Sequence, residues 1–214
     1  MAADRPVTPD PMAEPVTAPR QSSWNLPNIL TSVRILLVPV FVWLLWAGGT
    51  FGEDSLAMRW GAFAVFAVAM YTDKLDGDIA RARGLITDFG KIADPIADKL
   101  LTGSALVVLS LLGELWWWVT IVILVREWGI TLMRFVVLRY GVMPASRGGK
   151  LKTVLQTLAL GLLLMPLGAV LGDWWPWAGW VAMGAALVVA VVTGLDYVRQ
   201  AAALRSEALA RDSR

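Results

Sequence analysis

Residues 71–100 read YTDKLDGDIARARGLITDFGKIADPIADKL and place four aspartates, Asp73, Asp76, Asp94 and Asp98, at the ends of two long apolar stretches. The first two are three positions apart and the last two are four apart, so each pair shares one face of a helix. A short glycine-containing connection between the stretches makes the two helices antiparallel neighbours. We therefore expect the four carboxylates to come together at one end of a helical pair.

The chain contains neither His nor Cys. Imidazole and thiolate are therefore excluded as bases, nucleophiles or metal ligands, and so are disulfides and iron–sulfur clusters. Carboxylates that share a site repel one another unless protons or cations come between them. Carboxylate oxygens suit hard divalent ions, so we expect two Mg²⁺ or Mn²⁺ ions here, which would hold a phosphate or pyrophosphate group.

The composition is that of a membrane protein. Of 214 residues, 57% are hydrophobic and 17% are charged, whereas a soluble domain carries about 25% charge. The mean hydropathy is +0.61. The 19 basic and 17 acidic residues leave a net charge of only +2, which does not indicate a nucleic-acid-binding surface.

Six apolar segments are each roughly 20 residues long, enough to cross a bilayer. We place them at 29–47, 60–82, 93–113, 116–139, 151–171 and 176–198. The predicted fold is all-α, a polytopic membrane protein of six transmembrane helices with a polar cavity at the cytoplasmic interface.

The ends of the chain differ from this membrane domain, which we assign to residues 24–200. Residues 1–23 hold five prolines among small and acidic residues and predict a disordered tail. This tail lacks the basic start of a cleavable signal peptide, so we expect the first span to be retained. Residues 201–214 predict a polar cytoplasmic tail.

The basic residues sort almost completely onto one side of the six predicted spans. This set is Arg20, Arg81, Arg83, Lys91, Arg139, Arg147, Lys150, Lys152, Arg199, Arg205, Arg211 and Arg214. Only Arg59 falls in an opposite loop, and those loops carry acids and a cluster of tryptophans. The positive-inside rule then places both termini in the cytoplasm.

A second polar group lies in the fourth and fifth predicted spans. Arg126, Arg134, Lys150 and Lys152 together would form a basic pocket suited to an acceptor that carries a phosphate. Two simpler interpretations remain open. The role of Arg126 could be no more than an ion pair with Glu127, and that of the lysines no more than to anchor a helix end at the membrane surface.

Simpler interpretations also exist for the other polar positions. Asp94 followed by Pro95 is typical of a capped helix start. Asn28, Thr31 and Arg34 share a helix face and could meet a ligand, or could form a capped helix end whose arginine reaches the surface.

The spacing of the aspartate region resembles the signature of the CDP-alcohol phosphotransferase family at all eight of its positions. These are Asp73, Asp76, Gly77, Ala80, Arg81, Gly90, Asp94 and Asp98. Family members resemble this chain in having six transmembrane helices. The resemblance also implies a homodimer.

The resemblance implies roles for these positions. Two divalent cations on the signature aspartates hold the pyrophosphate of the CDP-linked donor. The metal ligands are then Asp73, Asp76, Asp94 and Asp98, and Asp98 also deprotonates the acceptor hydroxyl as the catalytic base. The CDP-binding residues are Asn28 and Thr31 of a Pro-Asn-x-x-Thr opening together with Asp76, Gly77, Ala80, Arg81 and Gly90.

The Arg126-Glu127 run, Arg134, the segment 149–153 and Gln156 resemble the bacterial branch of the family whose acceptor is glycerol 3-phosphate. We therefore expect an enzyme of the bacterial cytoplasmic membrane. It would transfer the phosphatidyl group of CDP-diacylglycerol to the 1-hydroxyl of glycerol 3-phosphate, release CMP and take its lipid substrate from the surrounding membrane lipids.

Other functions fit parts of the pattern. Within the family, the acceptor could be phosphatidylglycerol, giving cardiolipin, or inositol phosphate. Outside it, a cation-coupled transporter could use similar acids, although acids gathered at one face do not line a path across the bilayer. A purely structural membrane scaffold is disfavoured by the cost of keeping unpaired acids and Arg126 near hydrocarbon.

Overall fold

The computed structural model describes residues 26–83, 88–137 and 147–212, and within these ranges the secondary structure is helical throughout, without strands. The elements are α1 (Leu26–Gly48), the 3₁₀ turn η1 (Thr50–Gly52), α2 (Leu56–Arg83), α3 (Asp88–Leu111), α4 (Trp117–Val137), α5 (Arg147–Leu164), α6 (Gly168–Leu171) and α7 (Trp175–Asp212). The predicted all-α class is confirmed.

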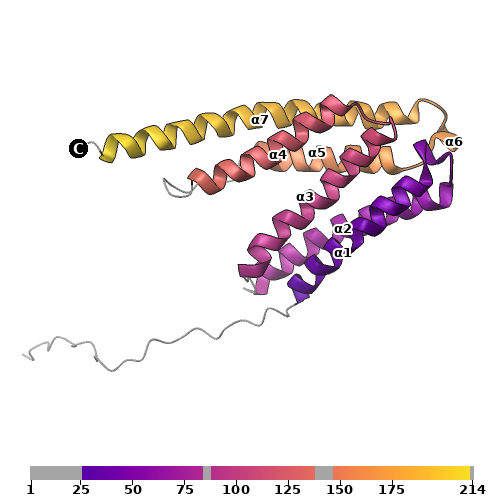
Figure 1. The fold of residues 1–214 in the computed structure, drawn as a ribbon, viewed down its shortest axis with the longest axis horizontal. Helices are drawn as coiled ribbons and strands as arrows, with labels where there is room; N and C mark the ends of the chain where they lie inside the picture. The colour runs from indigo at the N-terminus through magenta and orange to yellow at the C-terminus, as the bar shows by residue number, and fades with distance from the viewer. Residues whose placement is uncertain (1–25, 84–87, 138–146, 213–214) are drawn as a thin grey trace, which may run out of the picture.

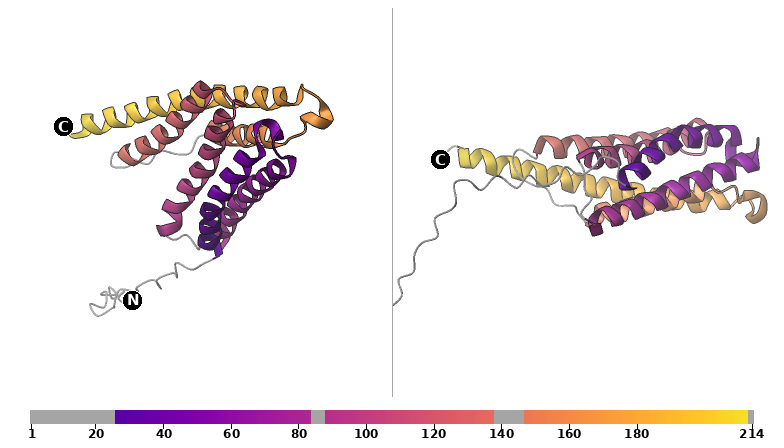
Figure 2. Two further views of the ribbon diagram at one scale, coloured as in Figure 1. Left: turned by 45° about the vertical axis from the view of Figure 1, so that its right-hand side comes forward. Right: turned by 90° about the horizontal axis from the view of Figure 1, so that it is seen from below.

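The helices form a bundle that is closed at one end and spreads toward the other (Figure 1). Helices α1 and α2 are an antiparallel pair on one side, and α5 packs along α7 with α4 beside them on the other side. Helix α3 runs from the free end of α2 across to α4 and so joins the two sides (Figures 1 and 2). The closed end holds the turns α1–α2, α3–α4 and α5–α7.

Helix α3 differs in one respect from its expected place. It packs far more extensively on α1 than on α2, although α2 and α3 are antiparallel and consecutive. Helix α3 leans away from α2 toward α4 (Figure 1). The predicted packing of α3 along α2 is therefore limited to a few contacts.

The core between the helices combines large and small side chains. Phe41 of α1 lies against Phe66 of α2, with 5.9 Å between ring centroids, and both are buried. Ala62, Ala69 and Ala105 are fully buried at helix contacts. Small residues let helix backbones approach closely, which is how helices associate where lipid removes the hydrophobic drive between them.

The outer surface of the bundle is strongly apolar. Large aliphatic side chains such as Leu36, Val125 and Val181 are 67–70% exposed, and many others on α1, α4, α5 and α7 are exposed as well. Such an extended apolar surface is suited to lipid rather than to water. Trp116, Trp117, Trp118, Trp174 and Trp177 belong to the tryptophan cluster of the loops opposite the basic residues and are exposed at the closed end, as is typical of a membrane surface.

Two helices in the described ranges are long and apolar enough to cross a membrane by length and composition, namely Asn28–Gly48 in α1 and Trp175–Ser206 in α7. The other four predicted spans correspond to α2, α3, α4 and α5. Their crossing of the membrane stays a prediction.

Three helix ends differ from the predicted spans. Helix α5 ends at Leu164 rather than near 171, because Pro166 cannot donate the next helical hydrogen bond. Helix α3 begins at Asp88 and contains Pro95, so the interpretation of Asp94 and Pro95 as a helix start is wrong. Helix α7 continues to Asp212 and, at about 57 Å, is far longer than a bilayer core. The predicted tail at 1–23 lies outside the described residues.

A buried ion pair holds the closed end together. The sequence placed Arg59 in a loop as the one base on the wrong side, but the structure places it in the first turn of α2 with no exposed surface. Its guanidinium contacts the carboxylate of Glu114, which precedes α4 and is also fully buried, through both nitrogens; Nη1 lies 2.7 Å from Oε1. Arg59, the one base that did not follow the charge pattern, is thus neutralised inside the protein by Glu114.

The same two side chains satisfy backbone groups of the α1–α2 turn and of the C-terminal end of α5. Arg59 donates to the carbonyl oxygens of Gly49 (3.2 Å), Leu163 (2.9 Å) and Leu164 (3.2 Å). Glu114 accepts from the Phe51 amide at 2.9 Å. Carbonyls at helix ends have no partner within the helix, so a buried end requires donors of this kind.

We expect Arg59→Met to lower the free energy of unfolding by about 3–5 kcal/mol, because it leaves the Glu114 carboxylate and three carbonyl groups buried without their donor. The measurement is unfolding in detergent micelles, with the exposed Arg205→Met as the matched control. A wild-type midpoint for Arg59→Met would show that the pair does not hold the bundle together.

Candidate active site

Two of the four predicted metal ligands have described side chains, and they lie near each other. Asp73 of α2 has a side chain that is 35% exposed, and Asp98 of α3 is partly buried. The two carboxylates interact electrostatically as like charges, and Asp98 is also within reach of the charges of Arg34, Glu127 and Lys152. The structure therefore gathers acids of α2, α3 and α4 with bases from α1 and α5.

The remaining predicted positions in this region cannot be placed in the same way. The surroundings of six of them lie outside the described part of the structure: Asp76, Ala80, Arg81, Gly90, Asp94 and Arg134. Among the side chains that are described, no group of three or more acids comes together. The four-aspartate set stays a prediction, and Gly77 lies in α2 between Asp73 and its C-terminal end.

The N-terminal turns of α1 contribute buried polar side chains to this end of the bundle. Asn28, Thr31 and Arg34 have exposed fractions of 4%, 0% and 1%, so the predicted shared face is turned inward. A guanidinium nitrogen of Arg34 contacts the Asp73 carboxylate. Arg34 was seen in the sequence only as part of a helix face, because a pairing over 39 positions gives no local signal.

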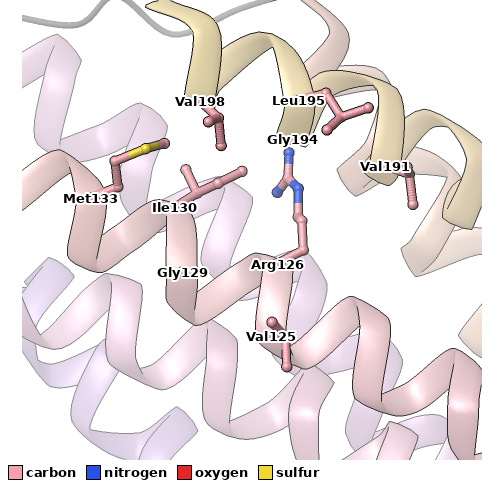
Figure 3. A pocket seen from close by; sticks show the side chains of 9 residues that line it. All are labelled: Val125, Arg126, Gly129, Ile130, Met133, Val191, Gly194, Leu195 and Val198. Carbon is pink, nitrogen blue, oxygen red and sulfur yellow. The ribbon is translucent and has the colours of Figure 1, made fainter. Parts of the chain in front are cut away.

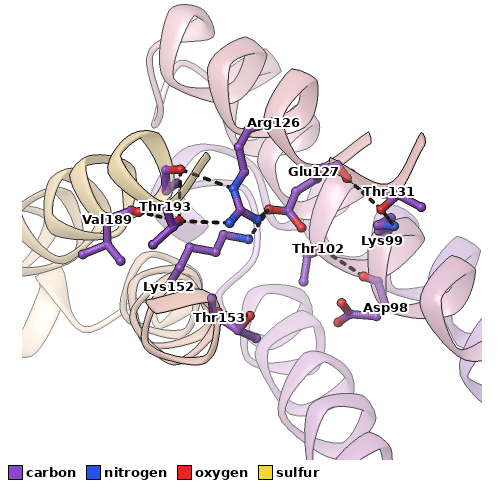
Figure 4. Close-up of polar contacts among 12 residues, drawn as sticks. Asp98, Lys99, Thr102, Arg126, Glu127, Thr131, Lys152, Thr153, Val189 and Thr193 are labelled. Atoms are coloured by element: carbon purple, nitrogen blue, oxygen red, sulfur yellow. Dashed lines mark hydrogen bonds and ion pairs between the residues drawn. The ribbon is translucent and has the colours of Figure 1, made fainter. Parts of the chain in front are cut away.

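A second cluster joins α4, α5 and α7 (Figure 4). Glu127 Oε1 accepts from Arg126 Nη1 at 2.7 Å and from Lys152 Nζ at 2.5 Å. Arg126 also donates through Nε to the Ala190 carbonyl at 3.3 Å and through Nη2 to Thr193 Oγ1 at 3.0 Å. Two predicted members of the basic pocket, Arg126 and Lys152, are thus brought together around one carboxylate.

Lys150 is not brought into this cluster. It is exposed, whereas Lys152 is 4% exposed. Residues two positions apart on a helix differ in direction by about 200°, so the two lysines at the start of α5 point to opposite sides. The structure separates the pair that the sequence had grouped.

Two further polar side chains lie near the cluster, Lys99, which the sequence did not single out, and Gln156, which it did. Lys99, next to Asp98, contacts the Thr131 hydroxyl and lies 5.4 Å from the ring centroid of Trp128 on α4. Gln156 is one turn beyond Lys152 and 3% exposed, and its Oε1 has no hydrogen-bond partner among the described residues. A buried carbonyl oxygen of this kind is suited to accept from a bound hydroxyl or a water.

An apolar cavity of about 320 Å³ lies between α4 and α7 next to this cluster (Figure 3). Valine, leucine, isoleucine and methionine side chains line it, and the Arg126 side chain extends along its inner wall toward Gly194. A Cβ on Gly194 would lie 3.4 Å from Arg126 Cγ, so the glycine leaves room for the arginine stem. The cavity therefore joins an apolar lining to a partly buried cation.

The geometry defines what the site can do. Carboxylates of α2 and α3 lie near cations of α1 and α5 at the spreading end of the bundle, about 21 Å along α2 from the Arg59 pair. Acids together with bound dications suit a diphosphate, while Arg126 and Lys152 suit a second phosphate. Such a site can align two phosphate-bearing reactants beside a carboxylate base.

Comparison with known proteins agrees with this chemistry. The sequence profile described as CDP-alcohol phosphatidyltransferase matches residues 24–192. A protein of Mycobacterium tuberculosis (strain ATCC 25618 / H37Rv), named "Probable phosphatidylglycerophosphate synthase", is 52% identical over 177 residues, which cover 83% of this chain and 81% of that protein.

More distant relatives have names of the same kind. Proteins of Bacillus subtilis (strain 168) and Rickettsia typhi (strain ATCC VR-144 / Wilmington) are both named "CDP-diacylglycerol--glycerol-3-phosphate 3-phosphatidyltransferase". The first is 37% identical over 184 residues, covering 81% of this chain and 93% of the relative. The second is 36% identical over 176 residues, covering 82% of this chain and 96% of the relative.

Proposed function

This chain belongs to the CDP-alcohol phosphatidyltransferase family, and we propose on that basis that it is a membrane enzyme that makes phosphatidylglycerophosphate. It transfers the phosphatidyl group of CDP-diacylglycerol to glycerol 3-phosphate and releases CMP. The observation that carries the choice of acceptor is the 52% identity, over most of both chains, to a relative with the corresponding name. The two cations Arg126 and Lys152, which meet at Glu127 near Asp98, support an acceptor with a phosphate.

The reaction is a phosphoryl substitution. The 1-hydroxyl oxygen of glycerol 3-phosphate attacks the phosphorus that carries the diacylglycerol, and the bond from that phosphorus to the bridging oxygen breaks, so that CMP leaves with this oxygen. Asp98 takes the hydroxyl proton. Arg126 and Lys152 bind the acceptor phosphate and hold its hydroxyl in line, which replaces a bimolecular encounter by an oriented one.

Divalent cations fit the donor set that the structure describes. Asp73 and Asp98 are carboxylates close enough to repel each other, and the chain offers no nitrogen or sulfur ligand of the His or Cys type. With Asp76 and Asp94 they would hold two Mg²⁺ or Mn²⁺ ions. The bound ions would neutralise the diphosphate of the donor.

The other residues of the site bind the donor in this proposal. Asn28 and Thr31 are buried on α1, and Gly77, Ala80, Arg81 and Gly90 complete the CDP pocket with Asp76. Arg34 keeps the Asp73 carboxylate in place by its contact with it. Arg134, and Lys150 after a change in its side-chain direction, would extend the basic surface around the acceptor.

The membrane setting is part of the proposal. We infer six crossings of the bacterial cytoplasmic membrane, with both termini and the polar cavity on the cytoplasmic side, where CDP-linked lipid and glycerol 3-phosphate meet. The apolar outer surface supports contact with membrane lipids. The enzyme would act as a homodimer, and residues 1–23 and 201–214 would lie outside the membrane domain at 24–200.

We expect Asp98→Asn to lower kcat by about 10²–10⁴-fold, because an amide cannot take the hydroxyl proton. The measurement is formation of phosphatidylglycerophosphate by purified protein in detergent. The matched control is Asp173→Asn, which changes an exposed aspartate of the α6–α7 turn. A wild-type rate in an intact Asp98→Asn variant would exclude Asp98 as the base.

Removal of divalent ions should stop the reaction. We expect activity to vanish in excess chelator and to return when Mg²⁺ or Mn²⁺ is added back, because the donor diphosphate and the aspartates repel each other without cations. Full activity in excess chelator would contradict the metal assignment while leaving the transfer reaction itself in place.

Offering acceptors in parallel tests the proposed function directly. With CDP-diacylglycerol and metal, purified protein should convert glycerol 3-phosphate, and not inositol phosphate, phosphatidylglycerol or glycerol, into a new lipid identified by mass spectrometry. A cardiolipin or phosphatidylinositol phosphate product would instead assign one of the other family reactions. Ion flux in proteoliposomes without consumption of CDP-lipid would assign a transporter.

A further inference from the structure

We propose that Glu127 is a positioning residue that assembles the acceptor-phosphate site by holding Arg126 and Lys152 side by side. The inference rests on the proposed function, because it concerns the same basic pocket. Glu127 lies in the described part of α4 and is not one of the eight signature positions.

Both cations converge on a single carboxylate oxygen. Arg126 Nη1 and Lys152 Nζ lie 2.7 Å and 2.5 Å from Glu127 Oε1, and Figure 4 shows the two side chains approaching it from α4 and α5. The side chains of Arg126, Glu127 and Lys152 are 13%, 19% and 5% exposed. The trio is therefore largely withdrawn from solvent.

Electrostatics explain why an acid is needed between these bases. Two cations held together in a poorly solvated site repel each other, and neither is stable there without a counter-charge. One carboxylate shared by both leaves the trio with a net single positive charge. The empty pocket is then stable, yet it still attracts a phosphate.

The two cations depend on Glu127 to different degrees. Arg126 has further anchors on α7, at the Ala190 carbonyl and the Thr193 hydroxyl. For Lys152, Glu127 is the hydrogen-bond partner that the described residues provide. Loss of the carboxylate should therefore release the lysine more than the arginine, so the effect of Glu127 on acceptor binding should act mainly through Lys152.

The experiment is a double-mutant cycle on steady-state kinetics with CDP-diacylglycerol and glycerol 3-phosphate. We expect Glu127→Gln and Lys152→Met each to raise KM for glycerol 3-phosphate by about 10-fold or more, the cost of one charge-assisted hydrogen bond. KM for CDP-diacylglycerol should stay within about twofold. The double variant should have the same KM for glycerol 3-phosphate as the single variants. Once Glu127 no longer positions Lys152, removing the lysine should have no further effect.

Two further variants separate positioning from folding. Glu127→Asp keeps the charge on a shorter arm and should give an intermediate KM for glycerol 3-phosphate, which also gives a result if Glu127→Gln does not fold. Glu53→Gln, which changes an exposed glutamate at the closed end, should leave both KM values unchanged. A general loss of stability would not select one substrate in this way.

The outcomes distinguish a failure of the Glu127 role from a failure of the proposed function. A wild-type KM for glycerol 3-phosphate in Glu127→Gln, a double variant whose effect equals the product of the single effects, or a Glu127→Asp variant no better than Glu127→Gln would overturn the role of Glu127 while the proposed function stands. A wild-type enzyme that does not use glycerol 3-phosphate would overturn the proposed function, and this role with it.

Discussion

The buried pair of Arg59 and Glu114 is the constraint on which the arrangement of helices depends. Helices in lipid gain little from hiding apolar surface from one another, so packing and polar contacts must hold them together. Here one guanidinium and one carboxylate connect the α1–α2, α3–α4 and α5–α6 turns by direct hydrogen bonds. Because these contacts fix the bundle at one end, the helices can spread at the other without losing their mutual register.

The spreading end contains charges of a different kind. Arg34 pairs with Asp73, and Glu127 pairs with Arg126 and Lys152, while Asp98 lies between the two groups and interacts with both. Charged groups near hydrocarbon are costly unless they are paired. The pairing here is incomplete, because Asp73 of α2 and Asp98 of α3 still interact as like charges. A site for cations and phosphates requires acids that are not fully neutralised by the protein.

Local patterns predicted much of this structure. Apolar run length located the helices to within a few residues at most ends, and the spacing of the aspartates identified the family before any fold was known. The Arg126-Glu127 run in an apolar stretch marked the second cluster, because charges at such depth are rarely without a role. That Asn28, Thr31 and Arg34 share one face also followed from helical periodicity, and the structure turns this face inward.

What could not be predicted depends on contacts between distant segments. Arg59 and Glu114 are 55 positions apart, so the sequence showed only an isolated base and a loop acid. Lys150 and Lys152 form a pair in sequence, but only the packing of α5 on its neighbours decides which one is buried. The helical path through Pro95 likewise reflects the tertiary support of α3 rather than the local preference of Asp94.

Helix α5 shows how the two ends of the molecule act together. Its C-terminal carbonyls at Leu163 and Leu164 bind Arg59, and its first turns present Lys152 to Glu127. The span between them is about 18 Å. A lysine side chain alone is flexible and defines a position poorly. The far end of α5 is fixed by Arg59, which Glu114 holds, and the Lys152 ammonium group is fixed by Glu127. The position of this cation therefore depends on two glutamates, and neither belongs to the aspartate signature.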